Sequence, residues 1–325
     1  MCHAYIMRKC HALVKRNILI ECMTHRNSLC EGNKEMEINK LKILLKVIAQ
    51  GNMTKASEDI SYSQSGISHV VKALERDFGF PLLVRNRIGV EATEDCKRVL
   101  PAIQQIIYWN EQLEQIAASV KGVTIGKVRI GTFTSMSVHW LPKIIKLFQS
   151  QYPNVEIELV EGGDQSLADG IENGLIDIGF GRKPVEMQTD WLPLFEDCLM
   201  AVLPAGSFEG KAFPIKHFHH APFIALPEYF DHEVADIFQE AGIVPDIKFS
   251  STDDYTIISM VEQGVGISVL PQMVLQGYKH CHIQAISLDP YHQRQLGIVL
   301  PSMNSASPAT RKFIECTQEV IRTAL

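Results

Sequence analysis

The segment of residues 52–87 constrains this chain most, because its pattern predicts two short helices followed by a basic hairpin. We expect the first helix over residues 54–60, with Thr54 as its N-cap, and a tight polar turn after it. The next helix has four apolar residues at spacings of three and four, which are Ile67, Val70, Val71 and Leu74. That spacing predicts one face turned toward a small core.

The opposite face of the second helix carries short polar side chains near its beginning, namely Gln64, Ser65, Ser68, His69 and Lys72. Donors and acceptors at the start of a helix suit contact with base edges in the major groove. A strand is expected over residues 80–84, and Arg85 and Arg87 then form a basic tip suited to phosphate contact. Thr54, Arg85 and Arg87 are therefore predicted to bind double-stranded DNA together with the five polar residues of the second helix. The alternative is a small helical domain with a solvated polar face.

The run SQSGISHVVKALERDFGFPLLVR closely resembles the winged helix-turn-helix of LysR-type transcriptional regulators. The similarity extends over roughly residues 36–325, and the usual serine, apolar and Leu-Glu positions of the family match Ser68, Val70, Leu74 and Glu75. Departures are His69, where Arg or Lys is usual, Leu82-Leu83 in place of Leu-Phe, and the segment 92–96 after the wing. The resemblance implies a ligand-responsive transcriptional regulator that acts in the cytoplasm and contacts RNA polymerase.

The balance of charged residues differs between the N-terminal part of the chain and the rest. Residues 1–92 hold 14 Lys and Arg against 9 Asp and Glu, whereas residues 93–325 hold 17 against 28. Attraction to DNA phosphates is therefore expected only from residues 1–92, the basic N-terminal part of the chain, which is called the head below. No apolar run approaches the roughly 20 residues of a membrane span. The eight cysteines contain no CxxC pair, which favours reduced thiols over a disulfide framework.

Residues 1–35 contain four cysteines, three histidines and six basic residues. Their spacing fits no zinc pattern, so a metal or redox arm is the weaker interpretation. A disordered extension or an over-long start is favoured, with Met36 as a natural first residue.

We expect a winged helix-turn-helix over 36–92, a linker helix over 93–122 and an effector-binding domain over 123–325.

The linker helix is expected to begin after Thr93 and to carry a heptad seam. The seam residues, at alternating spacings of four and three, are Val99, Ile103, Ile106, Asn110, Leu113, Ala117 and Val120. A seam implies a partner helix, and Asn110 would fix its register. We therefore predict a homodimer, or a homotetramer as the resemblance implies; the alternative is a helix packed on its own domain.

Beyond Gly122 the pattern alternates between strands and amphipathic helices, which predicts an α/β fold with a mostly parallel sheet. The resemblance implies a type 2 periplasmic-binding-protein-like arrangement of two subdomains. Subdomain I would comprise residues 123–196 and 296–325, and subdomain II residues 197–295. Hinge strands near residues 195–197 and 294–296 would join them.

Ligands in such folds bind at the carboxyl ends of strands and at helix N-termini. In family members the matching hydroxyl stretches often contact the effector, which implies Thr134, Ser135, Ser251 and Thr252 as contacts here. Arg182, after the third strand, would pair with an anionic effector. The alternatives are that these hydroxyls cap helices and that Arg182 is a solvated loop charge.

Other classes of protein fit less well. A solute-binding protein is contradicted by the helix-turn-helix and the lack of a secretory signal. An enzyme is disfavoured because no Gly-x-Ser-x-Gly, His-Glu-x-x-His or phosphate-binding glycine motif occurs. The local cluster of His217, His219 and His220 would need a further ligand to hold a metal, so a surface loop is favoured. We expect no metal and no cofactor.

Overall fold

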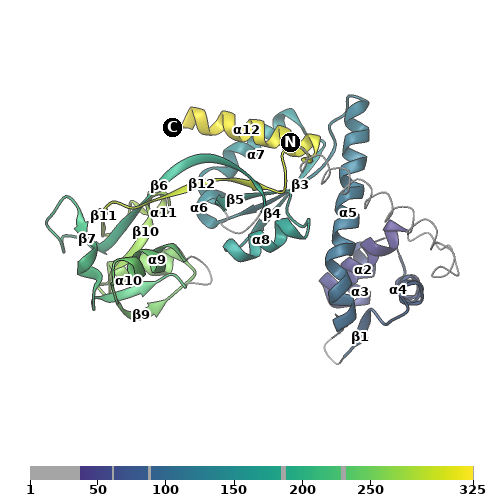
Figure 1. The fold of residues 1–325 in the computed structure, drawn as a ribbon, viewed down its shortest axis with the longest axis horizontal. Helices are drawn as coiled ribbons and strands as arrows, with labels where there is room; N and C mark the ends of the chain where they lie inside the picture. Colours follow the sequence, from purple (N-terminus) through teal and green to yellow (C-terminus); the bar gives the residue numbers. More distant parts are fainter. Residues whose placement is uncertain (1–36, 61, 87–88, 184–187, 228–231, 325) are drawn as a thin grey trace, which may run out of the picture. The chain divides into compact units, whose positions relative to one another are not determined.

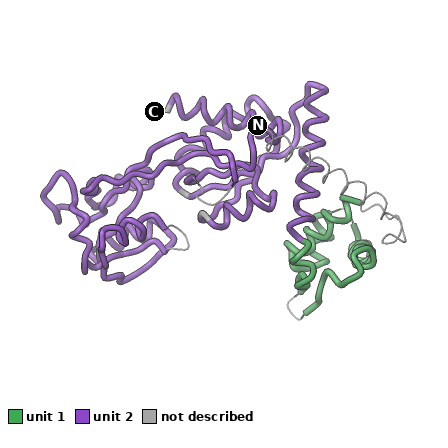
Figure 2. The backbone as a smooth tube through the Cα atoms, viewed as in Figure 1, with its two compact units in different colours: residues 1–99 green, residues 100–325 purple. Residues whose placement is uncertain are grey.

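The structure, a computed structural model, describes residues 37–60, 62–86, 89–183, 188–227 and 232–324. The backbone divides into two compact units, residues 1–99 and 100–325 (Figure 2). The predicted N-terminal extension, residues 1–35, lies outside the described residues. Among the described helices, none is long and apolar enough to cross a membrane.

The first unit is a winged helix-turn-helix (Figure 1). Its helices are α2 (Ile38–Gln50), α3 (Met53–Asp59) and α4 (Gln64–Phe78), and its strands are β1 (Leu83–Arg85) and β2 (Val90–Ala92). The predicted cap of α3 was wrong by two residues: Asn52 Oδ1 accepts from the backbone N–H of Thr54 at 2.8 Å and of Lys55 at 3.2 Å. An amide oxygen caps as well as a hydroxyl, so both residues were chemically eligible.

The wing turns back against the end of α2. Gly89 has a φ of +157°, and a Cβ atom there would lie 2.2 Å from the carbonyl oxygen of Gly51. The backbone N–H of Val90 donates to that same carbonyl at 2.7 Å. Only a residue without a side chain permits this approach.

The long helix α5 (Glu94–Val120) follows the wing. Thr93 acts as its cap, as predicted, since Thr93 Oγ1 accepts from the N–H of Cys96 at 3.1 Å. Glu94 and Asp95 occupy the first turn, where the helix dipole favours negative charge.

The second unit contains the two α/β subdomains. Subdomain I is built from β3 (Gly126–Thr132), α6 (Thr134–His139), α7 (Leu141–Gln151), β4 (Val155–Glu161), α8 (Asp164–Glu172), β5 (Ile178–Arg182) and α12 (Pro308–Ala324). One core packs β3 and β5 against α7 and α12, with Ile130, Phe148, Phe180 and Phe313 fully buried. A smaller cluster packs α8 on the other side of the same strands through Leu167 and Ile171.

Subdomain II is built from β7 (Phe213–Pro214), η2 (Ile215–Phe218), β8 (Pro222–Ala225), α9 (Glu233–Glu240), β9 (Asp246–Ser250), α10 (Asp254–Glu262), β10 (Ser268–Pro271), α11 (Gln272–Leu275), η3 (Gln276–Tyr278) and β11 (Ile283–Asp289). Its core divides between a cluster under α9 that includes Phe218 and Phe238 and a cluster under α10 that includes Ile257 and Ile258.

Two long strands join the subdomains, as predicted for the hinge. β6 (Asp190–Pro204) and β12 (Gln293–Leu300) pair antiparallel, with Leu296 opposite Phe195. In the described chain they continue one eight-stranded sheet in the order β4-β3-β5-β12-β6-β11-β7, with β10 on β6. The expectation of a mostly parallel sheet holds for β3, β4 and β5 and for β8 with β9, but the hinge strands and their neighbours are antiparallel.

Between β3 and β4 the chain forms two consecutive helices, α6 and α7. The break falls at Trp140, immediately before α7, which has Pro142 in its first turn. Proline is tolerated in a first turn but not inside a helix, because its ring clashes with the preceding turn. The four cysteines among the described residues, Cys96, Cys198, Cys281 and Cys316, are free thiols.

Candidate functional site

Helix α4 buries one face and exposes the other, as the sequence predicts. Ile67, Val71 and Leu74 are at most 3 % exposed, whereas the opposite side presents Gln64, Ser65, His69 and Lys72 to solvent, with Ser68 half-buried beside them. Ser63 Oγ accepts from the N–H of Gly66 at 3.1 Å and fixes the start of the helix. The five predicted base-reading and phosphate residues of α4 therefore share one accessible surface.

A shallow groove runs beside this surface, between α4 and the segment that leads into the wing. It is lined by His69, Lys72, Glu75, Arg76 and residues 79–81. Arg76 is exposed one turn beyond Lys72, and the sequence reasoning missed it. Its i+4 spacing from Lys72 was a sufficient signal, because residues four apart share a helix face.

Of the three remaining residues predicted to contact DNA, the structure describes two, and both are exposed. Thr54 is exposed at the start of α3. Arg85, at the end of β1, is exposed, and its Nη2 donates to the sulfur of Met53 at 3.3 Å. Arg87 lies outside the described residues.

Glu75 connects α4 to the wing. Its Oε1 accepts from the backbone N–H groups of Leu82 at 2.9 Å and Leu83 at 3.3 Å, where the chain enters β1. Leu82 is fully buried, so these donors have limited access to water. The carboxylate thereby sets the position of the wing relative to α4, a role that spacing alone does not reveal.

In subdomain I, the predicted effector residues follow β3 and β5. Thr134 is the first residue of α6, and Ser135 is 7 % exposed. Arg182 ends β5, and its Nη1 lies 3.4 Å from Oε2 of Glu233, the first residue of α9. Both side chains are about four-fifths buried, with exposures of 20 % and 16 %. The guanidinium of Arg182 is therefore largely buried and has a carboxylate partner, so Arg182 is not a solvated loop charge.

In subdomain II, Ser251 and Thr252 lie between β9 and α10. Ser251 Oγ accepts from the N–H of Asp253 at 3.1 Å, and Asp253 is the N-cap of α10, accepting from Tyr255 and Thr256. Ser251 thus has a local structural role, and Thr252 is exposed. The N–H of Ser251 donates to the carbonyl of Ala225 at 3.0 Å, which places this turn at the carboxyl end of β8.

A buried ion pair holds the hinge. Asp197 on β6 and Arg294 on β12 are 1 % and 6 % exposed, and Asp197 Oδ2 accepts from Arg294 Nε at 3.1 Å and Nη2 at 2.9 Å. Asp197 Oδ1 accepts from the N–H of Met273 at 2.9 Å and so ties α11 to the same point. Both carboxylate oxygens have partners, which a buried charge requires.

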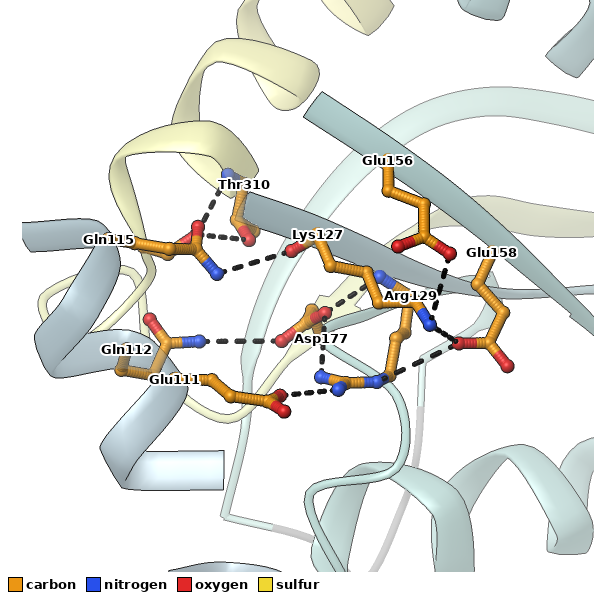
Figure 3. Close-up of polar contacts among 10 residues, drawn as sticks. Glu111, Gln112, Gln115, Lys127, Arg129, Glu156, Glu158, Asp177 and Thr310 are labelled. Carbon is orange, nitrogen blue, oxygen red and sulfur yellow. Dashed lines mark hydrogen bonds and ion pairs between the residues drawn. The ribbon is translucent and has the colours of Figure 1, made fainter. Parts of the chain in front are cut away.

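A polar network attaches α5 to subdomain I (Figure 3). Glu111 and Gln112 of α5 point toward β3 and the start of β5, where Glu111 pairs with Arg129 and Gln112 Nε2 donates to Asp177 Oδ1 at 3.4 Å. Asp177 Oδ2 accepts from the N–H of Arg129 at 2.7 Å. One turn on, Gln115 Nε2 donates to the carbonyl of Lys127 at 3.4 Å.

Asp177 is the titratable centre of this network. It is 3 % exposed, and desolvation raises its pKa to about 6, although the N–H and guanidinium of Arg129 oppose that shift. Burial likewise raises the pKa of Tyr108, which packs nearby on α5, to about 12. The sequence reasoning missed both residues, because nothing in their spacing shows that α5 covers this strand end.

The other face of α5 is apolar and exposed, but its composition differs from the predicted seam. The exposed stripe consists of Ile106, Trp109, Leu113, Ile116 and Val120, of which Leu113 and Val120 are 64 % and 83 % exposed. Ile103 is only 2 % exposed, so its assignment to an intermolecular seam was wrong. Asn110 Nδ2 donates to Glu114 Oε1 at 2.8 Å along the same helix. A heptad pattern cannot distinguish a residue buried by its own chain from one left for a partner.

The histidine cluster is divided among different contacts. The His217 ring packs against Phe213, with centroids 5.4 Å apart, and His219 Nδ1 accepts from the N–H of Val244. Among the described residues, no group of three or more His, Cys, Asp or Glu side chains could hold a metal ion.

Comparison with known proteins agrees with this geometry. Residues 38–97 match the family model for the bacterial regulatory helix-turn-helix protein of the lysR family, and residues 121–322 match the LysR substrate binding domain. An uncharacterized HTH-type transcriptional regulator, YvbU of Bacillus subtilis (strain 168), is 31 % identical over 291 residues, covering 88 % of this chain and 99 % of that protein.

Two further proteins are similar at lower identity. The malonate utilization transcriptional regulator of Klebsiella pneumoniae is 28 % identical over 273 residues, covering 81 % of this chain and 88 % of its own. The crystal structure of full-length CbnR complexed with its target DNA has a TM-score of 0.63 at 21 % identity, covering 88 % of this chain and all of that one. The latter likeness shows the fold.

Proposed function

Because this chain belongs to the LysR family of transcriptional regulators, which are DNA-binding proteins with an effector-binding domain and not enzymes, we propose specific roles for its residues. Gln64, Ser65, Ser68 and His69 read base edges in the major groove. Thr54, Lys72, Arg76, Arg85 and Arg87 contact the phosphate backbone. The observation that carries this proposal is the single exposed polar face of α4, which starts at a capped helix N-terminus.

The effector site lies between the two subdomains and accepts a small carboxylate. Ser135 and Arg182 of subdomain I and Ser251 and Thr252 of subdomain II contact the ligand, and Thr134 contributes at the start of α6. The proximity of Arg182 and Glu233 supports this site, because an ion pair from opposite subdomains marks where they approach each other. A relative that regulates malonate utilization makes malonate a rational first probe.

The effector signal reaches the head through α5. The domains are residues 36–92, 93–122 and 123–325, with subdomain I comprising 123–196 and 296–325 and subdomain II comprising 197–295. Glu111, Gln112 and Gln115 support this route, since their contacts hold α5 to subdomain I (Figure 3). A ligand that changes the relation between the subdomains would then change the direction of α5.

The working form is a homodimer or homotetramer in the cytoplasm that acts on promoter DNA and contacts RNA polymerase. The dimer forms through α5, whose stripe of Ile106, Trp109, Leu113, Ile116 and Val120 is apolar and exposed. Two heads in a symmetric dimer suit a two-fold symmetric operator. Val99 and Asn110 flank the stripe.

A quantitative gel shift on the DNA upstream of the chain's own gene tests the central proposal. Gln64→Ala should weaken binding to that fragment by at least tenfold relative to random DNA, while Glu58→Ala, an exposed change on α3, should leave it unaltered. Equal weakening in both variants, or none in Gln64→Ala, would reject α4 as the reading helix.

A further inference from the structure

A cavity of about 250 Å³, partly open to solvent beside the exposed Ile247, lies in subdomain II between α9 and the strands that it covers. Its walls come from β6, β8, β9, β10, α9 and the segment between α9 and β9. The principal lining residues are Leu199, Phe223, Leu226, Val234, Phe238 and Val269. None of these belongs to the polar residues proposed to contact the effector between the subdomains.

The side chains that line the cavity are almost all apolar. Within the described part of the chain, Gln239 is the one lining residue with a polar side chain, and no charged residue lines the cavity. Gln239 is exposed, so its amide is free to hydrate outside the cavity. A charged ligand would lose its hydration here without meeting a side chain of opposite charge.

The size of the cavity sets the size of the ligand. Protein interiors pack at the density of organic crystals and contain few voids larger than a water molecule. An engineered apolar cavity of about 150 Å³ stays dry and binds benzene. A space of about 250 Å³ therefore accepts a single aromatic ring with a short substituent, or a branched alkane of similar size.

The position of the cavity also favours a ligand. Ala225 and Pro271 line it at the carboxyl ends of β8 and β10, the ends at which α/β folds bind ligands. Val234 and Ala235 line it from the first turn of α9. That helix begins with Glu233, the partner of Arg182.

We propose that this cavity is a second ligand site, which takes one small uncharged apolar molecule, such as a monocyclic aromatic, under α9. The bound molecule fills space between Phe223, Phe238 and Val269 and contacts the helix that carries Glu233. Binding is driven by burial of apolar surface and needs no hydrogen bond from the protein. The site does not depend on the identity of the effector proposed to bind between the subdomains.

The test uses the full chain and fluorobenzene, whose binding is followed by ¹⁹F NMR, with 4-fluorobenzoate as the charged comparison. Wild-type protein should bind one fluorobenzene per chain saturably. Ala235→Leu, which adds methyl groups on the lining side of α9, should reduce that affinity at least tenfold. Ala241→Leu, at the exposed end of the same helix, is the matched control and should bind as the wild type does.

4-Fluorobenzoate can also bind at Arg182. Its affinity for the cavity is therefore taken only from the binding that is lost in the Ala235→Leu variant. This affinity should be at least tenfold weaker than that of fluorobenzene, and comparable affinities would overturn the assignment to an uncharged ligand. Should Ala235→Leu fail to fold, crystals of the wild type under xenon decide the matter. Xenon density between Phe223 and Phe238 supports the site, and its absence from this position overturns it.

Discussion

Arg182 Nη1 lies 3.4 Å from Glu233 Oε2, and the pair joins the end of the last parallel strand of subdomain I to the first turn of α9 in subdomain II. An anionic effector that binds Arg182 must compete with this carboxylate. Under the effector site proposed above, Glu233 would set a threshold for ligand affinity, because the ligand would have to replace it at Arg182.

Glu233→Gln should strengthen malonate binding by about tenfold, because the amide no longer neutralises Arg182; tenfold corresponds to about 1.4 kcal/mol. Arg182→Ala should abolish the same binding. Calorimetry with malonate measures both. Lys183→Ala, an exposed neighbouring cation, is the control and should change little. Unaltered affinity in Glu233→Gln would show that the two groups do not compete for one ligand.

Lys72→Ala and Arg76→Ala should each weaken binding to every DNA sequence and flatten its salt dependence. The slope of log K against log salt concentration should fall in magnitude by about 0.9 for each phosphate that the variant no longer neutralises. Filter binding from low to moderate salt concentration provides the slopes. Arg98→Ala, an exposed cation on α5, is the comparison. Weakening confined to the specific operator would instead assign these cations to base contacts.

Glu75→Ala should destabilise the winged head by about 1–3 kcal/mol, because two backbone donors at Leu82 and Leu83 lose their acceptor. Glu75→Gln keeps an oxygen at the same place and should recover most of that stability. Urea unfolding of the full chain, followed by circular dichroism, compares the variants. Equal destabilisation by both would indicate that the charge, and not the hydrogen bonds, matters at this position.

Protonation of Asp177 should change stability with pH. Its pKa is about 6 in the folded chain, above the value of about 3.8 when unfolded, so the folded state holds the proton more tightly. The resulting stabilisation is fully present below about pH 4 and is lost as pH rises through 6, amounting to roughly 3 kcal/mol.

Asp177→Asn removes that titration. The cost of the substitution, measured as the difference in unfolding free energy from the wild type, should therefore shrink as pH rises from 4 to 7. Glu158→Gln, an exposed carboxylate in the same network, is the control. A difference that stays constant across this range would show that Asp177 titrates alike in both states.

Ile106→Glu combined with Leu113→Glu should dissociate the dimer, since charge would enter a packed apolar contact. Sedimentation velocity measures the change in mass. Lys97→Glu, which alters an exposed position on the opposite side of the same helix, should leave the oligomer intact. An undiminished oligomer in the double variant would place the interface elsewhere.

Elements whose signals are local could be predicted from the amino-acid sequence. The face of α4, the cap at Thr93 and the hinge strands follow from periodicity, capping chemistry and a family resemblance. All three depend on residues close together in the chain, or on a motif long enough to identify. The Asn52 cap was missed because Thr54, two residues away, offered an equally good alternative.

Contacts between residues far apart in the chain follow only from the fold. Asp177 meets Gln112 across 65 positions and Arg294 meets Asp197 across 97, and neither pair shares a periodic pattern. Burial of Ile103 and exposure of Trp109 depend on which side of α5 the chain covers, which a heptad does not encode. Long-range packing fixes these relationships, because a side chain's charge and accessibility are set by what the fold brings against it.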